Sequence, residues 1–394
     1  MADASEGDAR PRATRRKRRP PGAVTIKEIA AASGVSIATV TRALQGHPRV
    51  RPETRARVQE AAEALGYRPN DAARTLATGA SNAIGLLLPS IGDRYWGEVV
   101  AGIESGADRA GFSVLLATSH GDTARSRRML DVLLAKRVDG FLVASRREVE
   151  EALEQAPLPV PVVRIGPDGE LDAADLATAC ELPPSELASW LERRGLDTPP
   201  EGVTAFDDVD AATIAVEHLA GLGHQRIAFV GASTRRSAAL RVVGFRESAQ
   251  RVGAESADVV ASPDSLEESD RVSRELLAGR SRPTAVVAYD DMVAIGVIRA
   301  AHALGLRVPE QVSVVGIDDI DVAAFIEPPL TTVRQPKHEL GRRAADALLT
   351  VLHGGAMPVG QAVRGELMLR GSTARPSGAR ARTRAENKTA ARRA

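Results

Sequence analysis

Short runs of aliphatic residues alternate with amphipathic stretches along most of this chain. Continuous apolar runs are typical of strands buried on both faces of a parallel sheet, and apolar residues recurring every three or four positions predict helices. The predicted strands are residues 84–88, 114–117, 141–144, 160–165, 227–230, 286–288 and 314–317. The predicted helices between them are residues 99–110, 126–136, 211–222, 240–251 and 292–304. This order predicts a doubly wound α/β architecture, which binds ligands at the carboxyl ends of its strands.

The segment that precedes these runs has a different pattern, that of three short helices. Thr25 and Glu28 are spaced as a capping box, which predicts a helix start between them. Gly34 permits a tight bend, after which Ser36 can cap a second helix. A third helix is expected over residues 52–65, where apolar residues recur on one face. Three helices of this length can close a small core.

The outer face of the second helix carries candidate chemistry. Ile37, Ala38, Thr41 and Arg42 are expected to point away from the small core. Arginine can donate two hydrogen bonds to guanine O6 and N7, and methyl groups can contact thymine, so this face suits a DNA major groove. Taken alone, the spacing fits an ordinary helical hairpin equally well.

The segment Val35-Ser-Ile-Ala-Thr-Val-Thr-Arg42 and its continuation Tyr67-Arg-Pro-Asn-Asp-Ala-Ala-Arg-Thr-Leu-Ala77 closely resemble the headpiece and hinge of the LacI/GalR family of bacterial transcription regulators. Thr41 stands where the family usually has a serine, and Arg51 stands where it commonly has a serine that caps the third helix. The resemblance implies that Leu76 inserts between base steps of a kinked minor groove. The DNA-contacting positions that it implies are Ser36, Ile37, Ala38, Thr39, Thr41, Arg42, Thr54, Asn70, Leu76 and Ala77. Among them Ile37, Ala38 and Arg42 would contact bases, and Ser36, Thr39 and Thr54 would contact phosphates.

The resemblance continues through the rest of the chain and covers nearly all of residues 24–373. It is carried by residues 136–140, 218–227, 315–319 and 328–335. It implies a body similar to the periplasmic sugar-binding proteins, in which two lobes close on a small effector. The effector-binding candidates, by position, are Tyr95, Trp96, Arg241, Asp290 and Asp318.

The five candidates are chemically compatible with a sugar or a planar base. An aromatic pair can stack on a ring, while arginine and aspartate form charge-assisted hydrogen bonds with hydroxyl groups. Other interpretations stay open: Tyr95 and Trp96 as a core pair, Arg241 as a surface residue, and Asp318 as a turn cap. Asp290 replaces an asparagine common in the family, which either favours a cationic or hydroxyl-rich ligand or changes nothing.

The largest departure from the family is an insert at about residues 166–202. It includes a stretch, residues 182–195, that is expected to form a capped helix with Trp190. Long insertions at a lobe crossing are often lids or partner surfaces, and a tolerated surface elaboration is the alternative.

Charge is distributed unevenly over the 394 residues, although the net charge is only +1. Residues 80–370 carry 30 basic and 42 acidic side chains, whereas residues 1–23 carry 7 and 3 and residues 371–394 carry 7 and 1. Basic ends on an acidic body are expected when only part of a chain faces nucleic acid. The terminal segments contain few apolar residues and are expected to be disordered.

Several classes of protein lack support in the sequence. One cysteine, Cys180, excludes an internal disulfide, and no apolar run of membrane-spanning length or signal-peptide pattern occurs. We therefore expect a cytoplasmic protein without membrane contact. The seven histidines form no metal-binding pattern, and no phosphate loop, nucleophile elbow or dinucleotide fingerprint occurs, so no metal, cofactor or catalytic residue is predicted.

Together these observations predict a non-enzymatic transcription regulator, a repressor, that binds a palindromic operator in double-stranded DNA as a homodimer. A small-molecule effector, a sugar or related metabolite, would modulate its affinity for DNA. Two alternatives are a regulator controlled by a protein partner and a solute-binding protein. The expected organisation is a basic arm (1–23), a helix-turn-helix headpiece (24–66), a hinge helix or linker (67–80), a two-lobed effector-binding and dimerisation body (81–373) and a basic tail (374–394).

Overall fold

The structure is a computed structural model of the chain. The described residues are 24–44, 46–67, 80–92, 94–166, 178, 182, 184–193, 199, 201–231, 236–254, 256–260 and 265–377. Among these, the residues up to Ser81 form one compact unit, and the residues from Asn82 onward form a second. In the described ranges, no helix is both long enough and apolar enough to span a membrane.

The described residues of the first unit form three helices, α1 (Ile26–Ser33), α2 (Ile37–Leu44) and α3 (Pro52–Ala64). The expected capping box starts α1: the backbone N of Thr25 donates to Glu28 Oε2 at 2.6 Å, and the backbone N of Glu28 donates to Thr25 Oγ1 at 3.4 Å. Gly34 has a φ of 66°, a left-handed conformation that lets the chain turn into α2 without strain. The buried apolar core consists of Ile29, Val40, Ala43, Val50, Val58 and Ala62.

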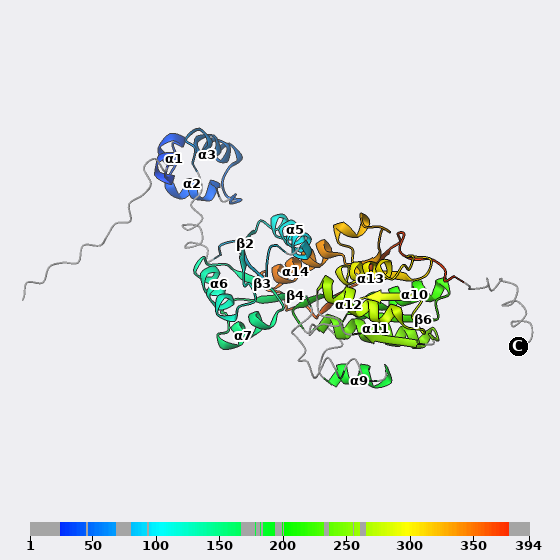
Figure 1. Ribbon diagram of the computed structural model, residues 1–394. Coiled ribbons are helices and arrows are strands. Elements are labelled where there is room, and N and C mark those ends of the chain that lie inside the picture. The colour runs from blue at the N-terminus through cyan, green and yellow to red at the C-terminus, as the bar shows by residue number, and fades with distance from the viewer. Residues whose placement is uncertain are drawn as a thin grey trace, which may run out of the picture. The chain divides into compact units, whose positions relative to one another are not determined.

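The second unit contains two six-stranded sheets (Figure 1), and we call each sheet with its helices a lobe. Lobe 1 has the strand order β11-β5-β4-β3-β1-β2, and its strands pair in parallel. Its strands are β1 (Ala83–Leu88), β2 (Ser113–Thr118), β3 (Gly140–Ala144), β4 (Val162–Ile165), β5 (Val203–Phe206) and β11 (Gln361–Val363). Its helices are α5 (Arg94–Arg109), α6 (Thr123–Ala135), α7 (Arg147–Gln155) and α14 (Lys337–Leu352).

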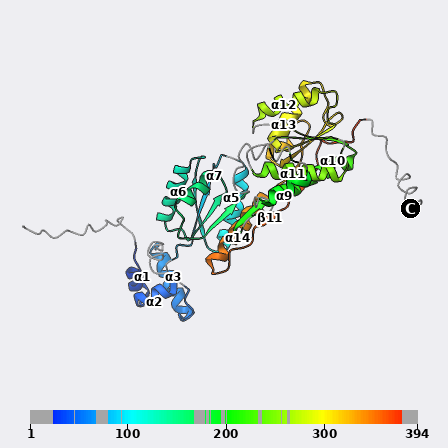
Figure 2. The same cartoon turned by 90° about the horizontal axis from the view of Figure 1, so that it is seen from below.

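Both faces of the lobe 1 sheet are covered by helices, with α6 and α7 on one face and α5 and α14 on the other (Figure 2). The side chains of β1 contribute to both faces, because successive side chains of a strand point to opposite faces of the sheet. Leu86 is buried in the same apolar cluster as Val99 of α5 and Leu340 of α14. Its neighbour Leu87 is buried in the cluster that contains Leu130 of α6.

Lobe 2 has the strand order β12-β10-β9-β8-β6-β7, in which only β12 pairs in the antiparallel direction among the described strands. Its strands are β6 (Arg226–Val230), β7 (Ser256–Val260), β8 (Ala285–Ala288), β9 (Ser313–Asp318), β10 (Thr331–Arg334) and β12 (Glu366–Met368). Its helices are α10 (Asp208–Leu222), α11 (Arg236–Arg251), α12 (Leu266–Ala278) and α13 (Asp291–Ala303), with the 3-10 helix η1 (Asp321–Ala324). In Figure 2, α10 and α11 lie on one side of this sheet and α12 and α13 on the other.

The chain passes between the lobes from β5 to α10, from β10 to α14 and from β11 to β12. As a result α14 belongs to lobe 1 although it follows a strand of lobe 2. Helices α5 and α14 cross closely at two glycines. A Cβ atom on Gly102 would lie 2.0 Å from the carbonyl oxygen of His338, and one on Gly341 would lie 2.0 Å from the carbonyl oxygen of Val99. A larger side chain at either position would collide with the backbone of the other helix, so the two glycines permit this close contact.

The predicted fold class, an α/β chain with a helix-turn-helix segment and a two-lobed doubly wound body, is confirmed. The seven predicted strands correspond to β1, β2, β3, β4, β6, β8 and β9. Five further strands, β5, β7, β10, β11 and β12, were not predicted. The basic arm and the residues after 377 lie outside the described residues.

Candidate functional site

Helix α2 presents one apolar and basic face to solvent. Ile37 is 48% exposed, and Ala38 and Arg42 are also exposed, whereas Val40 and Ala43 on the opposite face are buried. About half of the Ile37 side chain is left uncovered by the described residues of this unit. The arrangement therefore offers both apolar contacts and a guanidinium to one external surface.

Hydroxyl groups near the start of α2 are held in defined positions. Ser36 Oγ accepts a hydrogen bond from the backbone N of Thr39 at 3.2 Å, and the hydroxyls of Ser36 and Thr39 lie 2.9 Å apart. Thr41 Oγ1 donates to the carbonyl oxygen of Ile37 at 3.0 Å. The Thr41 hydroxyl is therefore engaged by its own helix.

A basic hollow of about 310 Å³ lies beside α2. Its lining residues are Thr39, Arg42, His47, Arg49, Val50, Arg51 and Thr54. Three of these, Thr39, Arg42 and Thr54, are sequence-predicted DNA contacts. The sequence reading missed His47 and Arg49, although three basic side chains at alternate positions, 47, 49 and 51, were a visible signal.

The hollow is shaped by the loop between α2 and α3. Arg55 Nη2 donates to the carbonyl oxygens of Gly46 at 3.3 Å and His47 at 3.1 Å. Arg51 precedes α3 without a side-chain capping bond, as its replacement of a capping serine led us to expect. The predicted hinge contacts Asn70, Leu76 and Ala77 lie outside the described residues.

A second cavity, of about 490 Å³, lies between the two lobes of the second unit, and we call it the cleft. All five predicted effector-binding residues, Tyr95, Trp96, Arg241, Asp290 and Asp318, line it. Other lining residues include Arg146 and Ser145 of lobe 1 and Asp208, Ser237 and Tyr289 of lobe 2. The cleft thus combines aromatic rings with charged groups, as small-molecule sites commonly do.

Arg241 is the centre of the polar contacts on the lobe 2 side. It is 4% exposed, so it is not a surface residue of α11. Its Nε donates to Asp208 Oδ1 at 2.7 Å, its Nη1 donates to the carbonyl oxygen of Tyr289, and its Nη2 lies 3.7 Å from Asp318 Oδ1. The guanidinium carbon also lies 4.7 Å from the centre of the Tyr289 ring, a cation–π distance.

Asp208 lines the cleft and was not predicted from the sequence. It follows the unpredicted strand β5 and starts α10, so the pattern of strands gave no reason to place it at the cleft. Burial raises the pKa of Asp208, and the neighbouring Arg241 guanidinium opposes that rise. A paired arginine is the partner that a buried carboxylate requires.

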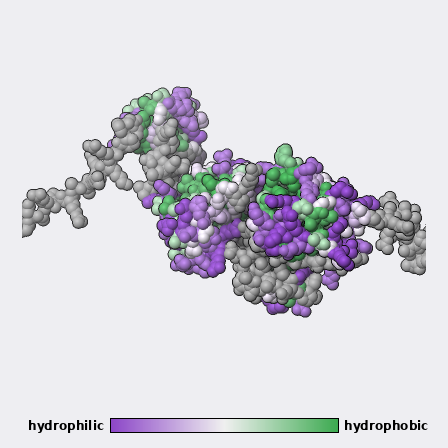
Figure 3. Space-filling model, viewed as in Figure 1, coloured by the Kyte–Doolittle hydropathy of each residue, from purple (hydrophilic) through white to green (hydrophobic). Residues whose placement is uncertain are grey.

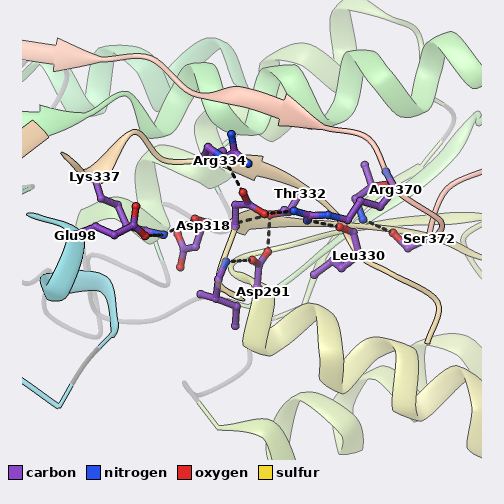
Figure 4. Close-up of polar contacts among 12 residues, drawn as sticks. Glu98, Asp291, Asp318, Leu330, Thr332, Arg334, Lys337, Arg370 and Ser372 are labelled. Carbon is purple, nitrogen blue, oxygen red and sulfur yellow. Dashed lines mark hydrogen bonds and ion pairs between the residues drawn. The ribbon is translucent and has the colours of Figure 1, made fainter. Parts of the chain in front are cut away.

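Asp318 connects the two lobes through Lys337. Gln335 donates its side-chain amide to Asp318 Oδ1, and Lys337 Nζ donates to the Asp318 carbonyl oxygen at 2.7 Å and lies 3.4 Å from Glu98 Oε1. Figure 4 shows Lys337 reaching from α14 toward Asp318, with Glu98 of α5 beside it. Burial raises the pKa of Asp318, and Arg241 and Lys337 oppose that rise.

The two aspartates at the start of α13 have different surroundings. Asp290 caps the helix by accepting from the backbone N of Val293 at 2.7 Å, and it also lines the cleft. Asp291 is fully buried and accepts from Thr332 Oγ1 at 2.5 Å and from the backbone N of Ile320 at 2.9 Å (Figure 4). Burial, with a further contribution from Asp318, raises the pKa of Asp291 to about 8.

Tyr95 and Trp96 pack edge to face, with ring centres 5.1 Å apart and an interplanar angle of 87°. Trp96 is only 4% exposed and belongs to the lobe 1 core, so most of its surface packs against the core, as one of the two interpretations of this pair expected. Burial, followed by the charges of Asp318 and Asp208, raises the pKa of the Tyr95 hydroxyl above its ordinary value. The tyrosine is therefore a neutral hydrogen-bonding group at the cleft wall.

The described part of the insert packs on lobe 2. Its helix α9 (Pro184–Arg193) lies against α11, and Trp190 is 8% exposed within the main core cluster of lobe 2. Arg246 Nη1 donates to the carbonyl oxygen of Leu182 at 2.5 Å. Neither Leu182 nor Trp190 lines the cleft, whereas Gly166 does. Among the residues that the structure describes, no cluster of three or more potential metal ligands occurs.

The chain is similar to known proteins in two regions and over most of its length. The model of the bacterial regulatory proteins of the lacI family matches residues 25–70, and that of the periplasmic binding protein-like domain matches residues 216–373. The HTH-type transcriptional repressor CytR of Escherichia coli (strain K12) is 31% identical over 356 residues, which are 89% of this chain and 96% of the relative. The ribose operon repressor of the same organism is 30% identical, with 82% of this chain and 92% of the relative covered.

Two solved structures are similar over the same length. The lac repressor dimer bound to operator and the anti-inducer ONPF has a TM-score of 0.70 and 29% identity, with 89% of this chain and 99% of that chain covered. The complex of the transcriptional regulator CelR with cellobiose has a TM-score of 0.60 and 27% identity, with 90% of this chain and 100% of that chain covered. These relatives are named as regulators or repressors of transcription.

Proposed function

This chain belongs to the LacI family of bacterial regulatory proteins, and on that premise we propose that it is a repressor of transcription that binds a near-palindromic operator as a homodimer. A small carbohydrate-like effector in the cleft modulates its affinity for DNA. The single observation that carries the proposal is the outward face of α2, where Ile37 and Arg42 are exposed on a helix whose other face is buried.

DNA reading is assigned to α2 and its surroundings. Ile37, Ala38 and Arg42 contact base edges in the major groove, and Arg42 recognises guanine by two parallel hydrogen bonds. Ser36, Thr39 and Thr54 contact backbone phosphates, which fix the register of the headpiece on the duplex. Thr41 contributes its methyl group, because its hydroxyl is bonded to the Ile37 carbonyl oxygen.

The hinge completes the DNA contact. We assign Leu76 as a wedge between central base steps, with Asn70 and Ala77 as neighbouring contacts. Unstacking one step costs a few kcal/mol, offset by contacts that the bent duplex permits. Since operator DNA is the partner, the site of action is the nucleoid in the cytoplasm.

Lobe 2 offers an apolar surface for a second copy of the chain. Phe325, directly after η1, is 86% exposed, and Val322 of η1 is 40% exposed. Figure 3 shows green hydrophobic patches among the purple hydrophilic surface of the lobes. A lac repressor structure that this chain resembles is a dimer on operator, which supports the second copy as the occupant.

The effector proposal follows from the cleft chemistry. Arg241, Asp290 and Asp318 supply the charge-assisted hydrogen bonds that polyhydroxylated ligands receive in buried sites, and Tyr95 supplies an aromatic edge. The CelR relative was solved with cellobiose, which supports a carbohydrate. We propose binding without catalysis, so the ligand is recovered unaltered.

Communication with DNA is assigned to the relative angle of the lobes. The Lys337 contact to the Asp318 carbonyl oxygen joins lobe 1 to lobe 2 at the cleft, so a ligand that displaces either group changes the interlobe contacts. A ligand shifts this equilibrium only by its differential affinity for the two lobe arrangements.

The experiment that tests the proposal has two steps. Genomic fragments retained by the purified protein are sequenced, and the enriched site is then titrated with protein in the presence and absence of sugars. We expect a two-fold symmetric site and a change in its affinity with at least one sugar. Retention of fragments without a shared sequence would contradict the DNA-reading role.

A further inference from the structure

The charged groups of the cleft are segregated between its two walls. Among the described lining residues, the three carboxylates, Asp208, Asp290 and Asp318, come from lobe 2. Lobe 1 instead contributes the cations Arg146 and Lys337. A ligand that fits this cleft therefore meets acceptors on one side and donors on the other.

The described residues place three cationic side chains at the cleft, and two of them form ion pairs or hydrogen bonds within the protein. Arg241 is bound to Asp208 at 2.7 Å and lies 3.7 Å from Asp318. Lys337 donates to the Asp318 carbonyl oxygen and is 3.4 Å from Glu98. Their charges are thus largely compensated before any ligand binds.

Arg146 is different, because no hydrogen bond or ion pair joins its side chain to any residue that the structure describes. The acidic residues that follow it on α7 are engaged elsewhere: Glu150 pairs with Arg164 at 2.9 Å, and Glu148 accepts from Ser119 Oγ at 3.1 Å. Arg146 is half-buried at the cleft wall and has no counter-charge among the described residues, so its guanidinium can donate hydrogen bonds to a ligand.

The backbone around Arg146 also favours a negative charge. Arg146 is the N-cap residue of α7, so that helix directs its amino end to the same wall. Helix α5 begins beside Tyr95 and α14 begins at Lys337, so three helix amino ends of lobe 1 lie at lining residues of the cleft. The partial positive charge of each amino end attracts anions.

From this segregation we propose that the effector carries an anionic group, a phosphate or a carboxylate, that Arg146 binds, while its hydroxyl groups face the carboxylates of lobe 2. The ligand class is a phosphorylated or carboxylated monosaccharide. The cleft volume of about 490 Å³ is adequate for such a molecule. This inference rests on the proposed function, since it specifies the ligand of the same cleft.

The test is calorimetric titration of the full chain with matched neutral and anionic sugars. The panel is glucose with glucose 6-phosphate and glucuronate, ribose with ribose 5-phosphate, galactose with galacturonate, and inorganic phosphate alone. We expect an anionic member to bind at least 10-fold more tightly than its neutral counterpart, equivalent to about 1.4 kcal/mol. The phosphate and carboxylate arms distinguish the two anions, and weak binding of inorganic phosphate is expected because the sugar contacts are missing.

Two variants assign the preference to Arg146. Arg146→Gln should remove the preference for the anionic sugar and keep the affinity for the neutral one. Arg147→Gln is the matched control, because Arg147 is exposed and pairs with Glu151 at 2.9 Å on the surface of α7. It should bind like the wild type, and equal thermal melting of both variants shows that folding is intact.

Three results would overturn the inference. Neutral sugars that bind as tightly as anionic ones and modulate operator affinity would leave the proposed function standing without an anionic effector. A loss of neutral and anionic binding alike in Arg146→Gln would indicate that Arg146 instead pairs across the closed cleft, for instance with Asp290. Absence of binding by every member of the panel would count against both proposals.

Discussion

Arg241 Nε lies 2.7 Å from Asp208 Oδ1, and neither side chain is more than 5% exposed. The pair joins the second turn of α11 to the start of α10 at the wall of the cleft. Because removing one partner of a buried ion pair leaves the other charge uncompensated, Arg241→Ala should lower the free energy of unfolding by about 3–5 kcal/mol. Denaturant unfolding measures this loss.

The same helix supplies a control for that variant. Arg251 pairs with Glu217 at 2.8 Å, but both side chains are more than half exposed. Exposed pairs contribute about 0–1 kcal/mol, so Arg251→Ala should change stability little. Equal losses in the two variants would mean that the buried pair has no special role.

Asp318→Asn tests the cleft with less risk to the fold, because the Asp318 side chain is 23% exposed. The amide removes the negative charge that faces Arg241 and the effector hydroxyls. We expect effector affinity to fall at least 10-fold while operator affinity without effector is unchanged. If the operator affinity of the variant still changes at the effector concentration that the wild type requires, Asp318 does not bind the effector.

The close crossing of α5 and α14 predicts different effects on stability for alanine substitutions at two glycines of α5. Gly102→Ala would place a methyl group 2.0 Å from the His338 carbonyl oxygen, so the helices must separate and the thermal midpoint should fall. Gly97→Ala, with no atom within 4 Å, should be neutral or more stable by roughly 0.5–1 kcal/mol. Similar melting of the two variants would contradict the close crossing.

The raised pKa of Asp291 predicts that the free energy of unfolding depends on pH. Its pKa of about 8 in the folded protein lies above the ordinary value of 3.8, so folding retains a proton that the unfolded chain has lost. This contribution is complete below the unfolded pKa and is lost as pH rises toward 8, by at most roughly 1.4 kcal/mol per pH unit. Unfolding measured from pH 5 to pH 9 should show the decline, and Asp291→Asn should reduce it. If the free energy of unfolding of the wild type rises over this pH range, and rises more than that of the variant, the raised pKa of Asp291 is refuted.

Sequence patterns predicted the elements whose signals are local. The continuous aliphatic runs of β1 and β3 predict buried strands, and the Thr25–Glu28 capping box predicts the start of α1. Strands β5 and β10 contain threonine and are only four residues long, so periodicity does not separate them from loops.

The missed strand β5 had a consequence for the cleft. Without it, Asp208 could not be placed at a strand end, and the partner of Arg241 remained unknown, since the two are 33 positions apart in sequence. The burial of Arg241 depends on such long-range contacts, and so does the lack of an ion pair for Arg146 among the residues that the structure describes. The effector-binding candidates themselves came from family resemblance and all lie at one cavity.

The most direct test of the account is the base preference of the headpiece. Binding of the full chain to a library of variants of its enriched operator is measured for the wild type, for Arg42→Ala and for Arg57→Ala, an exposed α3 residue that serves as the control. We expect Arg42→Ala to lose preference at one position in each half-site, with a cost of about 1–3 kcal/mol, while Arg57→Ala keeps the wild-type preference at every position. If Arg42→Ala weakens binding to every sequence equally and retains all base preferences, α2 does not read the operator through Arg42, and the central claim is contradicted.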